Sequence, residues 1–149
     1  MPAATSRPLV PALARIYPET TEWGYLLLRA VAGLMLIPHV WPKLMAGPSA
    51  VAANVMARRG IEPSLLAAWL VIITEVLGAI CITLGLFTRV VAALLVIEFL
   101  VIVKQHSTAG WMAGAQGAEF PFIWLIVFVF ILLRGGGPYS VDRKLGWEI

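Results

Sequence analysis

Charged residues are scarce in this sequence. Asp, Glu, Lys and Arg make up 13% of the 149 residues, whereas apolar side chains make up 60%. A soluble domain carries about 25% charged residues, and a domain of this size exposes too much surface to hide such an apolar excess. The scarcity excludes a soluble globular protein and indicates an integral membrane protein of one domain, with the lipid bilayer as its surroundings. The basic residues form no stripe interleaved with aromatic residues, so we expect no nucleic acid partner.

Cysteine and histidine are also rare, with one cysteine and two histidines. Cys81 alone cannot form an internal disulfide, a Cys-x-x-Cys pair or a cysteine-ligated cluster. Two histidines exclude a di-haem arrangement, and His39 and His106 both lie at predicted span ends. The sequence has no phosphate loop, nucleophile elbow or dinucleotide fingerprint. We therefore expect no metal or haem.

Residues 1–22 lack the apolar core of a cleavable signal and contain four prolines. Leu9, Leu13 and Ile16 recur at helical spacing, which predicts a short interfacial helix limited by Pro11. We therefore expect residues 1–22 to form a cytoplasmic or interfacial segment.

Long apolar runs dominate the rest of the chain. A membrane-spanning helix needs about 20 mostly apolar residues, and the first two runs meet this length without help. The last two reach it only when Lys104 and Arg134 are included, whose long side chains can snorkel to the interface. The predicted spans are residues 23–43, 64–87, 89–109 and 115–135. The sequence thus predicts an all-α fold: an integral membrane four-helix bundle over residues 23–135, with short interfacial helices and a polar tail at 136–149.

The connections between the spans give further expectations. Residues 50–59 read as a short amphipathic helix that Ser49 caps and Gly60 ends. The turn after Leu86 is tight, so the second and third spans should form an antiparallel hairpin. Lysine and arginine are more numerous on the side that holds both termini, which predicts cytoplasmic termini.

Three ionisable residues, Arg29, Glu75 and Glu98, fall inside the predicted spans. An unpaired charge at such depth costs about 2.5–3.5 kcal/mol on insertion scales. We therefore expect Arg29 to pair with Glu75, with Glu98 or with both, and a carboxyl group left over, such as Glu98, to be neutral. Such a network either fixes the helix register or lines a polar pocket that binds a ligand head group or passes protons.

A second group of ionisable residues lies at the opposite membrane boundary. Its members end the first span, end the third span and begin the fourth: His39, Lys43, Lys104, His106 and Glu119. Two histidines beside a carboxylate suit proton exchange, so this group can form a polar mouth to the pocket. The alternative is an interfacial polar belt with snorkelling lysines.

Several sequence stretches, covering roughly residues 23–143, resemble a known family. They are Arg29-Ala-Val-Ala-Gly33 with Pro38-His39-Val-Trp-Pro-Lys43-Leu44, Glu75-Val-Leu-Gly78 with Leu84-Gly-Leu-Phe-Thr-Arg89, His106 with Gly110-Trp111, and Glu119-Phe-Pro with Gly137-Pro-Tyr-Ser-Val-Asp-Arg143. In this order and spacing they resemble the DoxX family of small membrane proteins. The resemblance implies a four-helix bundle in a bacterial-type inner membrane. It also implies a link to redox chemistry, because the family is related to the membrane subunit of thiosulfate:quinone oxidoreductase.

From this resemblance we predict a membrane subunit of a quinone-associated oxidoreductase, and leave open whether the chain is itself a catalytic subunit. Glu75, Arg29 and His39 are the candidate catalytic residues. The candidate ligand-binding residues are Arg29, Glu75, Glu98, His39, Lys43, His106 and Glu119. Quinone is the expected cofactor. Because the chain has no redox centre of its own, a membrane or soluble redox protein is the expected partner, and a homo-oligomer is compatible with the apolar helix faces. The alternative is a non-catalytic anchor or assembly subunit of a larger membrane complex.

Overall fold

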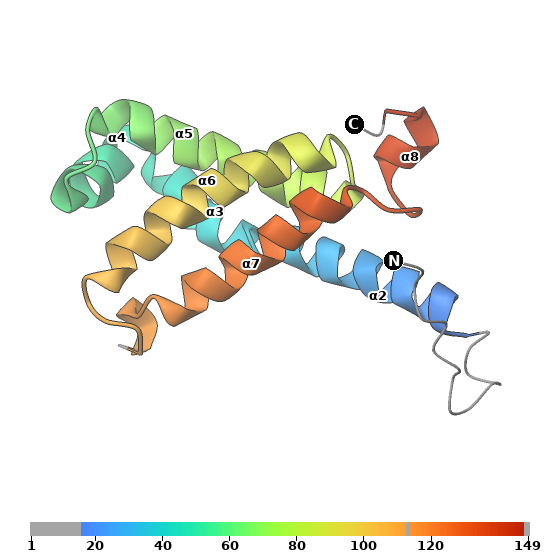
Figure 1. Ribbon diagram of the computed structural model, residues 1–149. Coiled ribbons are helices and arrows are strands. Elements are labelled where there is room, and N and C mark those ends of the chain that lie inside the picture. The colour runs from blue at the N-terminus through green and yellow to red at the C-terminus, as the bar shows by residue number, and fades with distance from the viewer. Residues whose placement is uncertain (1–15, 113, 148–149) are drawn as a thin grey trace.

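The computed structural model describes residues 16–112 and 114–147, and within them every regular element is a helix (Figure 1). The long helices are α2 (Tyr17–Leu34), α3 (Ile37–Ala46), α5 (Ser64–Leu77), α6 (Thr88–Ser107) and α7 (Glu119–Arg134). The short elements are α4 (Pro48–Val51), η1 (Ala52–Met56), η2 (Ala57–Arg59), η3 (Gly78–Ile82), η4 (Gly114–Gln116) and α8 (Val141–Leu145). The predicted all-α fold is confirmed. The interfacial helix expected around Leu9 and Leu13 lies outside the described residues, and the first helix begins six residues earlier than its predicted start at Trp23.

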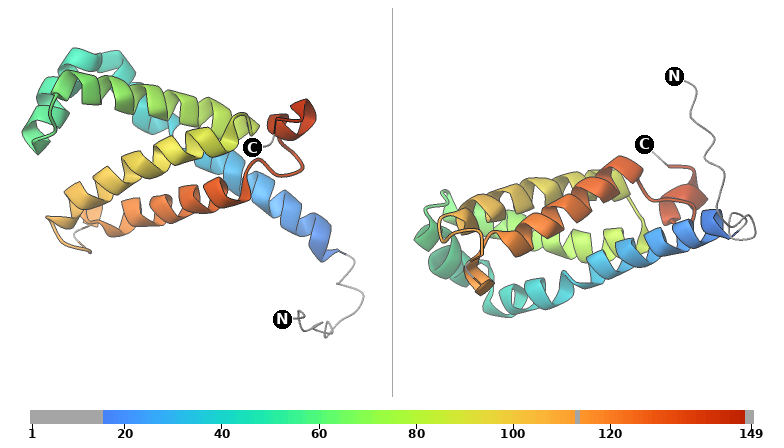
Figure 2. Two further views of the ribbon diagram at one scale, coloured as in Figure 1. Left: turned by 45° about the horizontal axis from the view of Figure 1, so that its top comes forward. Right: turned by 60° about the horizontal axis from the view of Figure 1, so that its bottom comes forward.

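The helices form a membrane bundle in which α6 and α7 lie side by side and α5 packs next to α6 (Figures 1 and 2). Among the residues that the structure describes, three helical stretches are long and apolar enough to cross a membrane: Glu19–Ala46, Ser64–Ile82 and Thr88–Ser107. The fourth predicted span corresponds to α7, which has 16 residues and covers about 24 Å at the helical rise. It packs along α6, but its role as a fourth span stays a prediction.

The first span bends where α2 passes into α3. Pro38 cannot donate to the carbonyl of Leu34, and its ring would collide with that carbonyl. The chain tightens there instead: the Leu36 amide donates to the Gly33 carbonyl (3.1 Å) and the His39 amide to the Leu36 carbonyl (3.1 Å). Beyond the bend, α3 packs against α5, which brings Lys43 to the second span.

Close helix packing depends on two glycines. A Cβ atom on Gly78 would lie 2.5 Å from Leu36 Cδ1 and 3.1 Å from Leu95 Cδ1, so this glycine lets η3 approach both the first span and α6. A Cβ atom on Gly33 would likewise collide with Thr83. Small residues at helix crossings are the usual means of tight packing inside membranes.

The segment predicted as an amphipathic helix over residues 50–59 is helical, but its start differs. It begins at Pro48, after Gly47, whose φ of 80° and ψ of 156° are open essentially to glycine alone, and no side chain caps the start of α4. Proline suits the first helical position because the amide there has no partner in any case. The segment runs through α4, η1 and η2 and ends at Gly60 (φ 69°), as expected.

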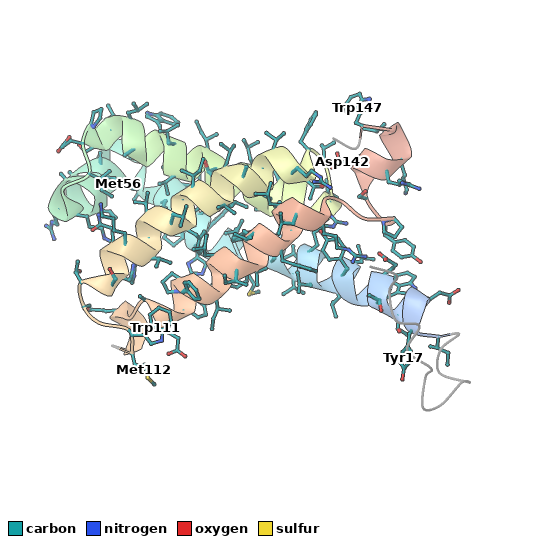
Figure 3. The ribbon with its side chains drawn as sticks, in the orientation of Figure 1. Tyr17, Met56, Trp111, Met112, Asp142 and Trp147 are labelled. Carbon is teal, nitrogen blue, oxygen red and sulfur yellow. The ribbon has the colours of Figure 1, made fainter. Side chains whose placement is uncertain are left out.

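The segment 136–149, predicted as a polar tail, does not leave the bundle within its described part. It forms α8 and returns to the turn between η3 and α6, where Asp142 lies (Figure 3). Ser140 and Asp142 are buried there, with 1% and 4% of their surfaces exposed. The Trp147 ring stacks on Phe87 at a centroid distance of 5.7 Å.

Candidate functional site

Three ionisable side chains from three helices meet inside the bundle. Lys43 of α3 forms a hydrogen-bonded ion pair with Glu75 of α5, and Glu98 of α6 interacts electrostatically with both. The carboxyl groups are deeply buried, because Glu75 is 3% and Glu98 8% exposed. We call these residues the Lys43–Glu75–Glu98 cluster.

The cluster has more hydrogen-bonding capacity than the protein uses. Three carboxyl oxygens are buried without any hydrogen-bond partner in the structure: Glu75 Oε2 and both oxygens of Glu98. Burying a polar group without a partner costs about 1–3 kcal/mol by protein mutational data, and native proteins rarely leave such atoms unpaired. The cluster therefore has acceptor positions that the described residues leave unused.

Arg29 does not belong to this cluster, so the ion pair expected between Arg29 and Glu75 or Glu98 is wrong. The side chain is fully buried, and its guanidinium donates to backbone carbonyls. Nη1 donates to Ile82 (2.6 Å) and Thr83 (3.2 Å), and Nη2 donates to Tyr139 (3.0 Å). The last carbonyls of a helix have no partner within it and carry partial negative charge, which lets them replace a carboxylate as the partner of a buried cation.

The surroundings of Arg29 form a compact polar lock at the end of the bundle that holds α8. Asp142 accepts hydrogen bonds from the amides of Phe87 (2.7 Å) and Thr88 (2.9 Å) and from Thr88 Oγ1 (2.7 Å), which caps the start of α6. Gly85 (φ 71°) lies so close to Arg29 and Ser140 that a Cβ atom would overlap both. We call Arg29, Gly85, Thr88, Ser140 and Asp142 the tail lock.

Sequence analysis missed Asp142, Thr88 and Ser140 as partners in a buried network. The polar tail contained the signal, since Ser140 and Asp142 sit where a helix cap and its first turn belong, and Ser140 does accept from the Arg143 amide (3.1 Å). That pattern predicts the start of α8. It does not predict that Asp142 reaches a second helix 54 residues away in sequence.

The structure does not bring together the residues that were predicted to form a polar mouth. Of these five, Lys43 is the one that joins the buried cluster. That lysine points inward to Glu75 instead of snorkelling outward. His106 Nδ1 lies 2.9 Å from the Ile102 carbonyl of its own helix. His39, Lys104 and Glu119 are exposed. In the residues that the structure describes, no group of three His, Cys, Asp or Glu side chains is arranged to hold a metal ion.

The surface also has an apolar groove of about 400 Å³ between α2 and α7. Its lining is Gly24, Leu27, Leu28, Val31, Ala32, Trp124 and Val127. Apart from the indole N–H of Trp124, the side chains of this lining offer no hydrogen-bonding group. The groove therefore suits a hydrocarbon chain, and the polar chemistry of the protein lies in the cluster.

Comparisons with known proteins agree with this architecture. The family model of DoxX matches residues 24–107. The chain is 31% identical over 125 residues to the inner membrane protein YphA of Escherichia coli. This alignment covers 80% of this chain and 88% of that protein. It is 29% identical over 121 residues to an uncharacterised protein of Haemophilus influenzae, with 78% and 87% covered. No solved structure matches. The chain thus belongs to the DoxX family and is a multi-pass protein of a bacterial inner membrane.

Proposed function

We propose that this protein is the membrane subunit of a quinone-associated oxidoreductase, and that the Lys43–Glu75–Glu98 cluster binds the quinone head group. The observation that carries the proposal is the set of three partnerless carboxyl oxygens beside a lysine inside the bundle. Intramembrane ionisable residues usually mark a ligand or proton pathway. His39 and Arg29 have no part in this version of the site, because His39 is exposed and Arg29 is used in the tail lock.

The chemistry of the cluster fits a quinone. Lys43 carries donors that can bind a carbonyl oxygen, and a protonated Glu98 can donate to a second oxygen. The free carboxylate oxygens can accept from the hydroxyl groups of the reduced form. A bound quinone would supply the electron-transfer chemistry, which no residue of this chain supplies. The protein's part is to hold the head group away from water and to hold a proton next to it.

Quinone binding to the purified protein tests this function. Full-length protein in mild detergent would be titrated with a short-chain quinone, and the bound fraction measured by native mass spectrometry. Hydrogen bonds to charged groups contribute about 1.5–3 kcal/mol, so Lys43→Met should weaken binding about tenfold or more. Glu119→Gln, which alters an exposed glutamate on α7, is the control and should bind like the wild type. Equal affinity in the wild type and in Lys43→Met would refute the site.

A second candidate function is a non-catalytic anchor or assembly subunit. The tail lock favours it, because Arg29, the most buried charged side chain among the described residues, serves the architecture of the bundle rather than an open pocket. In that case native mass spectrometry of protein released gently from its own membrane should show a stoichiometric protein partner and no quinone. Retention of a quinone that Lys43→Met loses would decide for the first function.

A further inference from the structure

We propose that the resting Lys43–Glu75–Glu98 cluster holds one exchangeable proton on Glu98, which the carboxyl group shares with Glu75. This inference deepens the proposed function because it concerns the same site. It does not depend on quinone, however, and the experiments below contain none.

The hydrogen-bonding pattern is the first argument. A carboxylate only accepts hydrogen bonds, so two ionised carboxylates side by side cannot satisfy one another. One added proton changes this. A protonated Glu98 becomes a donor, and Glu75 Oε2, which is buried and has no partner, is the acceptor beside it. A single proton thus pairs two of the three oxygens that the structure leaves unpaired.

The charge of the cluster is the second argument. The groups that face Glu98 are Glu75 from α5 and Lys43 from α3, and no charged group of α7 faces it within the described residues. With both glutamates ionised, the single lysine would leave a net negative charge in the bundle. A neutral Glu98 makes the cluster neutral, and a neutral cluster costs less free energy to bury inside the membrane than a charged one.

The exposure of the side chains differs within the cluster. The side chain of Glu75 is 4% exposed, whereas that of Lys43 is 25% exposed. Lys43 therefore links the buried carboxyl groups to the surface of the protein. We infer that the stored proton exchanges along this side chain.

Infrared difference spectroscopy tests the stored proton directly. The carbonyl stretch of a protonated carboxyl group is separate from the carboxylate bands, so it can be followed in full-length protein at neutral pH. We expect this band in the wild-type spectrum and its loss in Glu98→Gln, which replaces the protonated group with a neutral one of the same shape. The matched control, Glu119→Gln, removes an exposed glutamate and should leave the band intact. A band that persists in folded Glu98→Gln, or no band in the wild type, would overturn the proposal.

A chemical label keeps the test decisive if Glu98→Gln does not fold. Dicyclohexylcarbodiimide is an apolar reagent that adds to protonated carboxyl groups inside membranes. In the wild-type protein we expect the adduct on the peptide that contains Glu98, identified by mass spectrometry. An unmodified Glu98 peptide would count against the stored proton.

Removing Lys43 tests whether its positive charge compensates the negative charge of Glu75. Without its cation, Lys43→Met should take up a second proton on Glu75, so the infrared band should about double. An unchanged band would overturn the role of Lys43 as the compensating charge. If the proton is found while quinone does not bind, only the proposed function fails.

Discussion

The tail lock and the Lys43–Glu75–Glu98 cluster both bury ionisable side chains in the bundle, yet they differ in how fully those side chains are bonded. Arg29 donates to three carbonyls, and Asp142 accepts from three donors. In the cluster a single ion pair is formed, and three carboxyl oxygens have no partner.

This difference separates architecture from a site. Where the fold satisfies most of the bonds of a buried charge, as it does for Asp142 and for Arg29 apart from its Nε, the charge holds the fold together and has little capacity left for a ligand. Where the fold leaves acceptors unused, the protein bears a cost that structure alone does not explain. Stability should therefore depend strongly on the tail lock and weakly on the cluster, whereas binding should depend on the cluster.

The largest loss of stability is expected for Arg29→Ala. The change removes the donor from the buried carbonyl of Ile82 and from the partly buried carbonyls of Thr83 and Tyr139, and it opens a cavity. We expect a loss of about 3–5 kcal/mol, because a buried carbonyl without its donor costs about 1–3 kcal/mol and the deleted side chain leaves a cavity. Thermal unfolding in detergent measures it. Arg58→Ala, at an exposed arginine of η2, is the control and should unfold like the wild type.

A smaller loss is expected for Asp142→Ala, which removes the cap from the start of α6. Loss of a helix cap costs about 0.5–2 kcal/mol, and the three bonds that Asp142 accepts place this site near the upper end. Amide hydrogen exchange should accelerate at Phe87 and Thr88 in particular. Asp142→Asn keeps one accepting oxygen, so its exchange rates at these two amides should lie between those of Asp142→Ala and of the wild type. Unchanged exchange at both amides would show that the tail does not hold this turn.

For Lys43→Met we expect a loss of about 1.5 kcal/mol, at the lower end of the contribution of a hydrogen bond to a charged group. The loss stays below that of Arg29→Ala, since a proton can neutralise Glu75 whereas nothing can replace the donors of Arg29. Thermal unfolding of the two variants in one detergent checks the order. A larger loss for Lys43→Met would mean that the cluster, too, is architecture.

The two regions also show how far sequence reasoning reaches. Apolar runs predict the all-α membrane fold, and the rarity of buried charges singles out Arg29, Glu75 and Glu98. The partners were not predictable in the same way. Reasoning from sequence pairs opposite charges. The partners of Arg29 are instead backbone carbonyls of Ile82 and Thr83, which are free to accept because the helix ends there. The bend at Pro38 turns α3 toward α5, so Lys43, expected at the interface, takes the place assigned to Arg29.

The smallest effect on stability, and the sharpest contrast, is expected for Glu98→Gln. If Glu98 is already neutral, an amide of the same shape changes no charge, and its NH2 group can donate to Glu75 Oε2. We expect the free energy of unfolding to change by about 0.5 kcal/mol or less, as for substitutions away from critical features. Thermal unfolding beside Glu119→Gln measures this change. A loss as large as that of Arg29→Ala would mean that Glu98 is ionised and bonded in the folded protein. If Glu98→Gln is as stable as the wild type and lacks the protonated carboxyl band, then the acid at position 98 is not needed for the stability of the fold.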